Sequence, residues 1–353
     1  MTSLIATMGP AILSPQTLHG AIARGVSAVR FSASKFSADE LAAQARQTAE
    51  TGASLGRPLD LLLDLPGAKT RLTNEDFFSL AGLERLHVLY HPAPARRDGP
   101  LPQIGTTGMA IAPYIEPGDI LVLGDGEDAL RVESCTTEGC VTRPLTHGDV
   151  GRHKGISLHG KPQAYQALGD AEAIALKGLL DSVFSGVIVS FVEDPDTLEQ
   201  ARSLIGKAPD DGRPAPAVIA KIETRAGAER AAELARAADG VLLGRGDLLL
   251  DAGELDFYDL GKKVMKETQK AGRPIIVGTQ LIPSLSDGWL PNRSELAYLS
   301  HLIEKEVDGL MLATETTVRS APLRTVELVT ALIERYGSGA APAPLFPSRS
   351  AAA

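Results

Sequence analysis

The sequence places charged side chains at the ends of short apolar runs, where they could bind a metal ion and an anion. Lys221 and Glu223 lie two residues apart at the end of one run, so their side chains share a face of an extended strand. Taken alone, this pair is more typical of an ion pair inside a barrel. Asp247 follows the next run and adds a second carboxylate, which favours a Mg²⁺ site completed by substrate oxygens and water.

Cationic side chains that follow other apolar runs favour an anionic substrate. Arg30 lies near the end of one such run and Arg71 follows another, and together with Lys221 they could surround a phosphate. The segment 244–247 supplies small residues and backbone N–H groups that can bind a carboxylate, although a glycine pair alone is more often a plain turn. The pattern therefore predicts a small metabolite that carries both a phosphate and a carboxylate.

Eight apolar runs would position these residues. Amphipathic stretches separate most of the runs, and Ser14, Ser37 and Asp194 are typical helix N-caps at the start of three of these stretches. This alternation predicts an α/β protein, a (β/α)₈ TIM barrel whose active site lies at the C-terminal ends of its strands. The predicted strands are residues 3–6, 28–31, 60–64, 187–191, 217–222, 241–243, 274–277 and 309–312.

One interval between strands is too long to be a loop of a βα unit. Residues 72–151 contain short β-like runs and turn sequences, which predict a small, inserted, mostly antiparallel lid domain. The barrel would then comprise residues 1–71 and 152–336. Residues 337–353 are rich in Ala, Pro and Ser and predict a disordered tail.

Composition limits the class of partner. The 353 residues carry a formal net charge of −9, which disfavours nucleic acid, and no apolar run approaches the ~20 residues of a membrane helix. The N-terminal segment does not resemble a secretory signal, and the two cysteines, Cys135 and Cys140, match no zinc spacing. We therefore expect a cytoplasmic protein that binds small charged metabolites, with neither nucleic acid nor membrane as a partner.

The motifs as a set resemble those of the pyruvate kinase family, and they occur in that family's order. The resemblance covers residues 3–336 with a shortened lid, and it stops before the family's separate C-terminal effector domain, which we expect to be absent. The motifs are Thr7-Met-Gly-Pro10, Ala28-Val-Arg30, Asp64-Leu-Pro-Gly-Ala-Lys-Thr-Arg71, Gly151-Arg-His-Lys-Gly-Ile-Ser157, Ile219-Ala-Lys-Ile-Glu-Thr224, Gly244-Arg-Gly-Asp-Leu248, Gly278-Thr-Gln280 and Glu315-Thr316.

The resemblance implies phosphoryl transfer between phosphoenolpyruvate and a nucleoside diphosphate. It implies Mg²⁺ (or Mn²⁺) on Glu223 and Asp247, with Lys221 beside the transferring phosphoryl group and Arg30 neutralising that group. Thr279 matches the position that holds the substrate carboxylate and lies near the point where the enolate is protonated. This agrees with the analysis of the residues, because phosphoryl transfer depends on positioning and charge neutralisation.

Further positions follow from the same resemblance. The backbone of Gly246 and Asp247 would bind the substrate carboxylate, and Arg71 would also contact substrate. Pro10 and Lys154, with Arg71, match positions near the nucleotide. The implied partners are phosphoenolpyruvate or pyruvate and ADP or ATP, and the implied assembly is a homo-oligomer joined through the barrel.

Departures from the family pattern concern the monovalent cation and the nucleotide. Ser34 and Asp64 match cation ligands, but the family's Asn-Phe-Ser-His-Gly is replaced by residues 32–36, Ser-Ala-Ser-Lys-Phe. Leu65 cannot coordinate a cation through its side chain. Lys69 stands where the family usually has Glu, as in K⁺-independent members. We therefore hypothesise that Lys69 substitutes for K⁺ and that K⁺ is not required.

Two other functions remain open from the sequence. A Mg²⁺-dependent lyase or aldolase could stabilise a pyruvate enolate on the same barrel without a nucleotide. The altered segment 32–36 favours this alternative, whereas the lid and Lys154 favour the kinase. A catalytically silent binding protein is the third class, and the presence of Lys221, Glu223 and Asp247 together with Thr279 argues against it.

Overall fold

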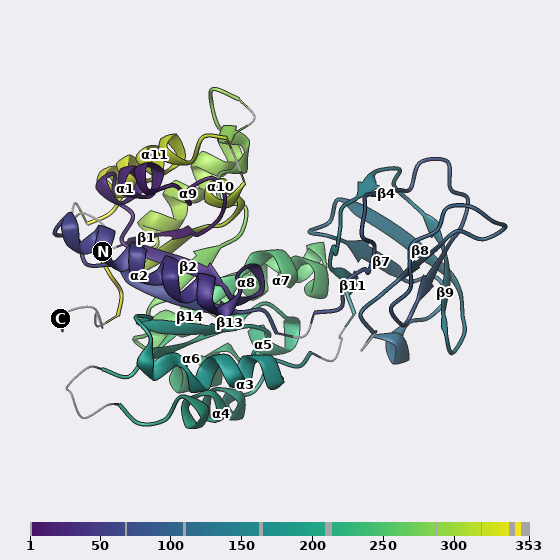
Figure 1. Ribbon diagram of the computed structural model, residues 1–353, viewed down its shortest axis with the longest axis horizontal. Coiled ribbons are helices and arrows are strands. Elements are labelled where there is room, and N and C mark those ends of the chain that lie inside the picture. The colour runs from purple at the N-terminus through teal and green to yellow at the C-terminus, as the bar shows by residue number, and fades with distance from the viewer. Residues whose placement is uncertain are drawn as a thin grey trace.

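Eight parallel strands close into a barrel in a computed structural model that describes residues 2–67, 69–108, 111–161, 165–208, 214–286, 288–318, 320–338 and 343–346. The strands pair in the order β1-β16-β15-β14-β13-β12-β3-β2, and the predicted barrel is confirmed (Figure 1). Their bounds are β1 (Ser3–Thr7), β2 (Ala28–Ser32), β3 (Asp60–Leu65), β12 (Gly186–Val189), β13 (Ala217–Ile222), β14 (Gly240–Gly244), β15 (Ile275–Gly278) and β16 (Gly309–Leu312).

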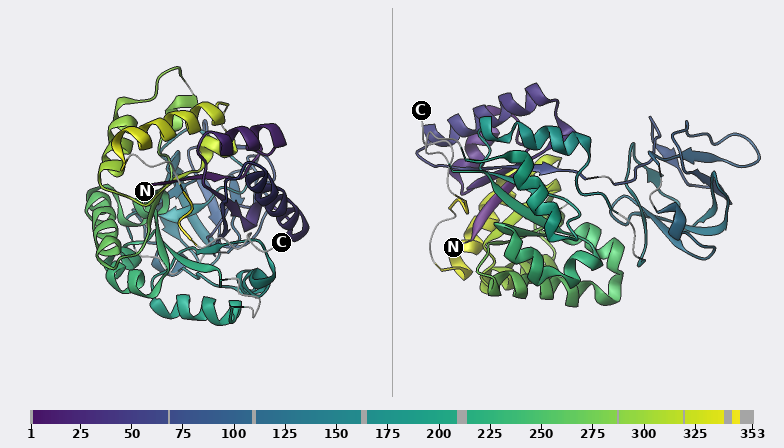
Figure 2. Two further views of the ribbon diagram at one scale, coloured as in Figure 1. Left: turned by 90° about the vertical axis from the view of Figure 1, so that its left-hand side faces the viewer. Right: turned by 90° about the horizontal axis from the view of Figure 1, so that it is seen from below.

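Helices surround the barrel in a ring (Figure 2). The predicted caps form: Ser14 accepts the N–H of Thr17, and Ser37 makes a reciprocal capping box with Glu40. The α-helices are α1 (Pro15–Ala23), α2 (Ala38–Ser54), α3 (Asp170–Lys177), α4 (Pro195–Ile205), α5 (Arg225–Glu229), α6 (Ala231–Ala237), α7 (Arg245–Ala252), α8 (Glu254–Lys270), α9 (Arg293–Glu304), α10 (Thr314–Thr317) and α11 (Pro322–Tyr336). None of the described helices is long and apolar enough to cross a membrane.

The inserted domain is built from two small sheets beyond the C-terminal ends of the barrel strands (Figure 1). One sheet has the order β11-β7-β8-β9-β5-β6, in which only β5 and β6 pair in parallel, and the other pairs β10 with β4. The strands are β4 (Phe78–Ser79), β5 (Leu86–Leu89), β6 (Gln103–Gly105), β7 (Ile120–Leu123), β8 (Asp128–Cys135), β9 (Gly139–Pro144), β10 (Asp149–Val150) and β11 (Ile156–Leu158). The predicted boundary at residue 151 precedes β11, which still belongs to this domain's sheet.

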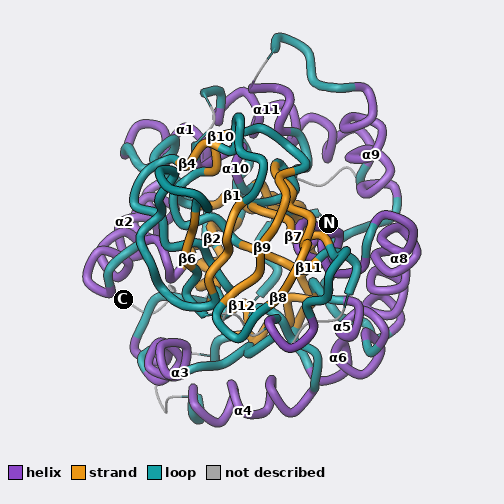
Figure 3. Tube along the Cα trace, turned by 90° about the vertical axis from the view of Figure 1, so that its right-hand side faces the viewer, coloured by secondary structure: helices purple, strands orange, loops and turns teal. Residues whose placement is uncertain are grey.

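Viewed from the side of the inserted domain, its strands overlie the barrel mouth, and the helices lie around the edge (Figure 3). The barrel strands alternate between two apolar clusters, as a period of two requires. Leu4 and Val241 belong to the large cluster, whereas Ile5 and Leu242 belong to a small one that also includes Phe346. The barrel interior is therefore a packed core that leaves polar chemistry to the strand ends.

Part of the C-terminal segment packs against the N-terminal end of the barrel. The backbone N–H groups of Leu345 and Phe346 donate to the buried carboxyl group of Asp60 at 2.5 and 3.2 Å, and Phe346 is 8 % exposed. The predicted disorder of residues 337–353 is therefore wrong for residues 343–346, because two apolar side chains and two hydrogen bonds offset the entropy of ordering them. Residues 339–342 and 347–353 lie outside the described residues.

Candidate active site

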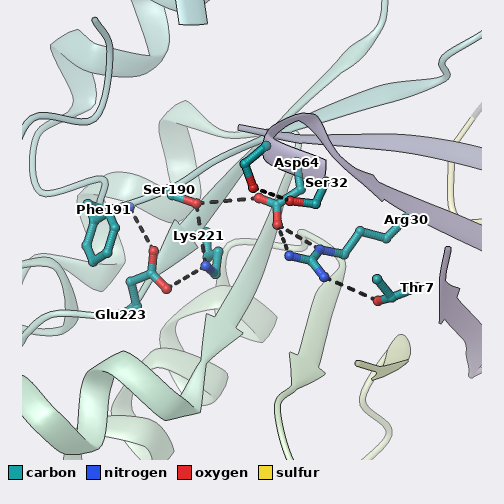
Figure 4. Close-up of polar contacts among 9 residues, drawn as sticks. Thr7, Arg30, Ser32, Asp64, Ser190, Phe191, Lys221 and Glu223 are labelled. Atoms are coloured by element: carbon teal, nitrogen blue, oxygen red, sulfur yellow. Dashed lines mark hydrogen bonds and ion pairs between the residues drawn. The ribbon is translucent and has the colours of Figure 1, made fainter. Parts of the chain in front are cut away.

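Lys221 and Glu223 form an ion pair at the C-terminal end of β13. The Nζ of Lys221 lies 2.6 Å from Oε2 of Glu223, which is 1 % exposed, and the backbone N–H of Phe191 donates to Oε1 at 3.0 Å (Figure 4). Phe191 directs this N–H from a left-handed conformation, with φ of 55°, which is costly for a bulky residue. The structure therefore holds Glu223 in one orientation.

Gly244, at the end of β14, permits the carboxylate to approach the backbone. A Cβ atom there would lie 2.8 Å from both Cβ and Oε2 of Glu223, which is closer than packed atoms tolerate. Helix α7 begins directly after Gly244 and carries Asp247 in its first turn. The first N–H groups of a helix have no partner within the helix, so those of this turn can bind an anion, and the helix dipole favours negative charge at the same point.

Asp247 pairs with Lys69, which follows β3 on the other side of the barrel. The side chain of Lys69 passes over Gly155, where a Cβ atom would lie 2.6 Å from Cε of Lys69. The Lys69 side chain is only 13 % exposed. The predicted internal cation is thus present, but its partner is the candidate metal ligand Asp247 and its position differs from the hypothesised one beside Asp64.

Asp64 is neutralised by Arg30 instead. The Nε and Nη2 atoms of Arg30 both donate to Oδ2 of Asp64, with Nε at 2.7 Å, and Nη1 donates to Oγ1 of Thr7 at 3.3 Å (Figure 4). The other carboxylate oxygen, Oδ1, accepts the hydroxyl of Ser190 at 3.4 Å. Because two N–H groups of Arg30 converge on one oxygen of the Asp64 carboxylate, Arg30 is held in a defined orientation at the barrel mouth.

Ser190 connects the two ion pairs and was missed by the sequence analysis. Its hydroxyl accepts from Nζ of Lys221 at 3.4 Å and donates to Asp64, so one hydroxyl joins the Lys221–Glu223 pair to the Arg30–Asp64 pair. The only signal in the sequence is that Ser190 falls near the end of a predicted strand. Serine is common in such positions, and only closure of the barrel shows what the hydroxyl contacts.

Burial and the charges of neighbouring side chains shift the pKa of each of these groups. Burial raises the pKa of Glu223 to about 7, and the nearby charge of Asp247 adds to this, while Lys221 opposes it. Burial would also raise the pKa of Asp247, but Lys69 and Lys221 outweigh it and the pKa is lowered. For Lys221, burial opposes the charged form, yet the carboxylates of Glu223, Asp64 and Asp247 raise its pKa. Lys221 is therefore a permanent cation near neutral pH.

Thr279 lies close to this cluster at the end of β15. A Cβ atom on Gly246 would lie 3.0 Å from Cγ2 of Thr279, so the threonine side chain packs against the first turn of α7. Thr279 and Gln280 both have left-handed conformations, with φ of 71° and 47°. The Nη1 atom of Arg245 donates to the carbonyl oxygen of Thr279 at 3.0 Å and supports this unusual backbone.

Glu315 fixes the neighbouring loops. Its carboxylate is fully buried and accepts the backbone N–H groups of Leu281 and Ile282 at 2.9 and 3.1 Å and that of Ala313 at 2.9 Å. Three backbone donors satisfy a charge that would otherwise be costly to bury. Glu315 thus holds the segments after β15 and β16 together.

In the described chain, four other predicted residues form no hydrogen bond or ion pair with Lys221, Glu223 or Asp247. Arg71 donates from Nη1 to the carbonyl oxygen of His153 at 3.3 Å, and Lys154 pairs with Glu127 in the inserted domain at 3.2 Å. The hydroxyl of Ser34 contacts that of Ser32 at 3.1 Å, which gives it a partner other than Asp64. Pro10 is exposed.

The carboxylates of Glu223 and Asp247 suit a divalent cation whose remaining coordination positions are filled by substrate oxygens. They come from neighbouring strands, and each influences the other's pKa. Oε2 of Glu223 is buried and lies 2.6 Å from Nζ of Lys221, and a carboxylate oxygen with one such contact still has a lone pair for a metal ion. Within the described chain no group of three or more His, Cys, Asp or Glu side chains is arranged around a metal site. Two carboxylates plus substrate oxygens are a typical Mg²⁺ arrangement.

The barrel and the charged cluster at its mouth define a (β/α)₈-barrel enzyme with an anion and cation site at the strand ends. The sequence matches the family model described as "Pyruvate kinase, barrel domain" over residues 1–326. The chain therefore belongs to the pyruvate kinase family, which is a family of phosphotransferases.

Curated relatives agree with this assignment. The pyruvate kinase of Agrobacterium vitis is 27 % identical over 336 residues, which cover 94 % of this chain and 68 % of that protein. The pyruvate kinase of Aeropyrum pernix is 25 % identical over 332 residues, covering 94 % and 70 %. The pyruvate kinase of Encephalitozoon cuniculi is 27 % identical over 345 residues, covering 95 % and 76 %.

Proposed function

We propose that the protein catalyses Mg²⁺-dependent phosphoryl transfer between phosphoenolpyruvate, or a related enol phosphate, and a nucleoside diphosphate. The observation that carries this proposal is the cluster of Lys221, Glu223 and Asp247 at the barrel mouth, in which Lys221 lies 2.6 Å from the buried Glu223 and both groups influence Asp247. Glu223 and Asp247 would hold Mg²⁺ (or Mn²⁺). When bound, the ion supplies positive charge that stabilises the oxygens of the phosphoryl group.

Lys221 acts as a fixed cation in this proposal. Its Nζ is held by Glu223 and Ser190, which orients the ammonium before substrate arrives and leaves it a further N–H donor. The surrounding carboxylates keep it charged, so it neutralises the phosphoryl group and does not act as a base. Arg30, held by Asp64, supplies a second positive charge with the same preorganisation.

The substrate carboxylate would bind at the start of α7. The backbone N–H groups of Gly246 and Asp247 lie in its first turn, and the Thr279 side chain packs against Gly246. In this pose the Thr279 hydroxyl would lie near the reacting end of an enolpyruvate, where a proton would be delivered to the enolate after the phosphoryl group leaves. Arg71 would add a cation at the side facing the inserted domain.

The nucleotide would bind between the barrel mouth and the inserted domain, near Pro10, Arg71 and Lys154. Lys154 now pairs with the exposed carboxylate of Glu127, so a nucleotide phosphate would replace one solvated anion with another. Potassium is not required in this proposal, because Arg30 already neutralises Asp64 and Lys69 provides a cation beside Asp247.

Replacement of Lys221 tests the proposal directly. Lys221→Ala should abolish phosphoryl transfer from phosphoenolpyruvate to ADP, while Mn²⁺ binding measured by electron paramagnetic resonance remains largely intact, since both carboxylates are retained. Lys177→Ala on the exposed surface of α3 is the matched control and should keep full activity. Phosphoryl transfer retained by Lys221→Ala would contradict the assigned role.

A thermal-shift titration separates the kinase from the lyase or aldolase. ADP, phosphoenolpyruvate and pyruvate are each added with and without Mg²⁺, because a ligand that binds only the folded state raises its melting temperature. We expect stabilisation by ADP and by phosphoenolpyruvate. Stabilisation by pyruvate and Mg²⁺ with no effect of ADP would instead support the lyase.

A further inference from the structure

A cavity lies on the outer wall of the barrel, away from the candidate active site, between α8 and α9, which are neighbours in Figure 3. Its volume is about 570 Å³, which falls within the range of small-molecule sites. Leu243 of β14 and Val307 contribute apolar surface, and the remaining lining residues belong mainly to the two helices. The cavity shares Arg245 with the structural support of the Thr279 loop, but otherwise it is separate from the barrel mouth.

The charge of this cavity is opposite to that of the protein as a whole. Arg245, Lys262, Lys266 and Lys305 line it, and its described lining contains no Asp or Glu, although the whole chain has a net charge of −9. A local concentration of cations against an acidic background creates a positive potential that attracts anions.

The lysines that face the cavity lack the partners that their neighbours on α8 have. Lys263 donates to the carbonyl oxygen of Glu229 at 2.7 Å, and Lys270 pairs with Glu267 at 2.7 Å. In the described chain, Lys262, Lys266 and Lys305 form no such ion pair. Lys262 lies over the Tyr258 ring at 5.9 Å and Lys266 interacts with Glu267 only at longer range, so the three ammonium groups remain available to an anion.

Aromatic side chains form another part of the same cavity. Phe257, Tyr258 and Tyr298 all line it, and this is a notable concentration in a chain that is only 4 % aromatic. The guanidinium of Arg245 lies 4.6 Å from the ring centroid of Tyr298. Ring faces bind planar apolar groups, and cations bind phosphate oxygens, so the two parts of the lining suit two parts of one molecule.

We propose that this cavity binds a small organic phosphate that carries a planar ring, and that the bound ligand acts as an effector of the Thr279 loop. Arg245 is the connection, because it lines the cavity and its Nη1 donates to the carbonyl oxygen of Thr279 at 3.0 Å. A ligand that attracts this guanidinium changes the support of the left-handed backbone at Thr279. The effector role rests on the proposed function of Thr279, whereas the binding site does not.

Isothermal titration calorimetry on the full chain tests the binding site with phenyl phosphate as the probe. Phenol and inorganic phosphate are its two halves, and we expect each to bind at least tenfold more weakly than phenyl phosphate. The double variant Lys262→Gln/Lys266→Gln should weaken phenyl phosphate binding at least tenfold. The double variant Lys263→Gln/Lys270→Gln is the matched control on the same helix, and it should bind as the unmodified protein does.

Three results would overturn the proposed binding site. These are equal affinity for inorganic phosphate and phenyl phosphate, binding that persists unchanged in the Lys262/Lys266 variant, and loss of binding in Lys221→Ala, which would place the probe at the barrel mouth. Circular dichroism confirms that each variant is folded.

The effector role has its own readout. Phenyl phosphate should change the KM for phosphoenolpyruvate in the unmodified protein but not in the Lys262/Lys266 variant. An unchanged KM with binding intact would refute the effector role alone, and absence of any phosphoryl transfer would count against the proposed function without affecting the binding site.

Discussion

Replacement of Asp60 by asparagine should change how the stability of the barrel depends on pH. The Asp60 carboxyl group is fully buried at the N-terminal end of the barrel, where it accepts the N–H groups of Leu345 and Phe346 and the hydroxyl of Ser185. Burial raises its pKa from 3.8 to about 6, even though these hydrogen bonds favour the charged form.

The size and sign of the effect follow from the thermodynamic linkage between proton binding and folding. The folded state binds the Asp60 proton more tightly than the unfolded state does. Well below pH 3.8 the carboxyl group is protonated in both states. Between pH 3.8 and 6 it ionises in the unfolded state first, so the free energy of unfolding falls as pH rises through this range. One pKa unit corresponds to about 1.4 kcal/mol, so the whole shift is worth about 3 kcal/mol, of which about 2.4 kcal/mol is lost between pH 4 and pH 7. An asparagine side chain does not ionise, and Asp60→Asn should not show this loss.

Urea unfolding followed by circular dichroism at several pH values between 4 and 8 measures the difference. The free energy of unfolding of Asp60→Asn relative to the unmodified protein should rise by about 2.4 kcal/mol from pH 4 to pH 7. Asp98→Asn, which changes an exposed carboxylate in the inserted domain, is the control and should show no such rise. A difference for Asp60→Asn that stays constant over this range would refute the reasoning.

Three further predictions concern packing and the active site. Phe346→Ala should lower the free energy of unfolding by about 2–3 kcal/mol in urea denaturation, because the ring is 8 % exposed and packs into the barrel end; an unchanged value would show that the segment is not needed for stability. Gly244→Ala should reduce phosphoryl transfer by about 100-fold, since a Cβ atom would displace Glu223, whereas Gly178→Ala, where the nearest atom is 3.8 Å away, should retain activity. Activity in a buffer free of K⁺ should equal that with K⁺ added, and a requirement for K⁺ would refute the proposal that Arg30 beside Asp64 and Lys69 beside Asp247 make the ion unnecessary.

Much of the barrel could be predicted from the sequence because its signals are local. Each strand is a short, mainly apolar run with a polar residue at or near its end, and the helix caps lie within a few residues of the N–H groups that they accept, as Ser37 and Glu40 show. The two-residue spacing of Lys221 and Glu223 gives them one face of a strand whatever the rest of the chain does. Their ion pair and the adjacent Asp247 could therefore be expected before the fold was known.

The partners of the remaining site residues depended on contacts between distant segments. Ser190 joins Asp64 to Lys221 only because β12 pairs with β3 on one side and β13 on the other. The Lys69 side chain pairs with Asp247 and not with Asp64. The sequence alone did not show which of these two carboxylates would be its partner.

The sequence by itself determined the strand and helix pattern and the kinds of charge at the barrel mouth, because these depend on periodicity and on residue type. Only the tertiary structure decided which charges pair, that Phe191 and Thr279 take left-handed conformations, and that Phe346 covers the barrel end. These features arise when segments far apart in the chain meet, and their energies come from burial and hydrogen bonds that no local pattern records.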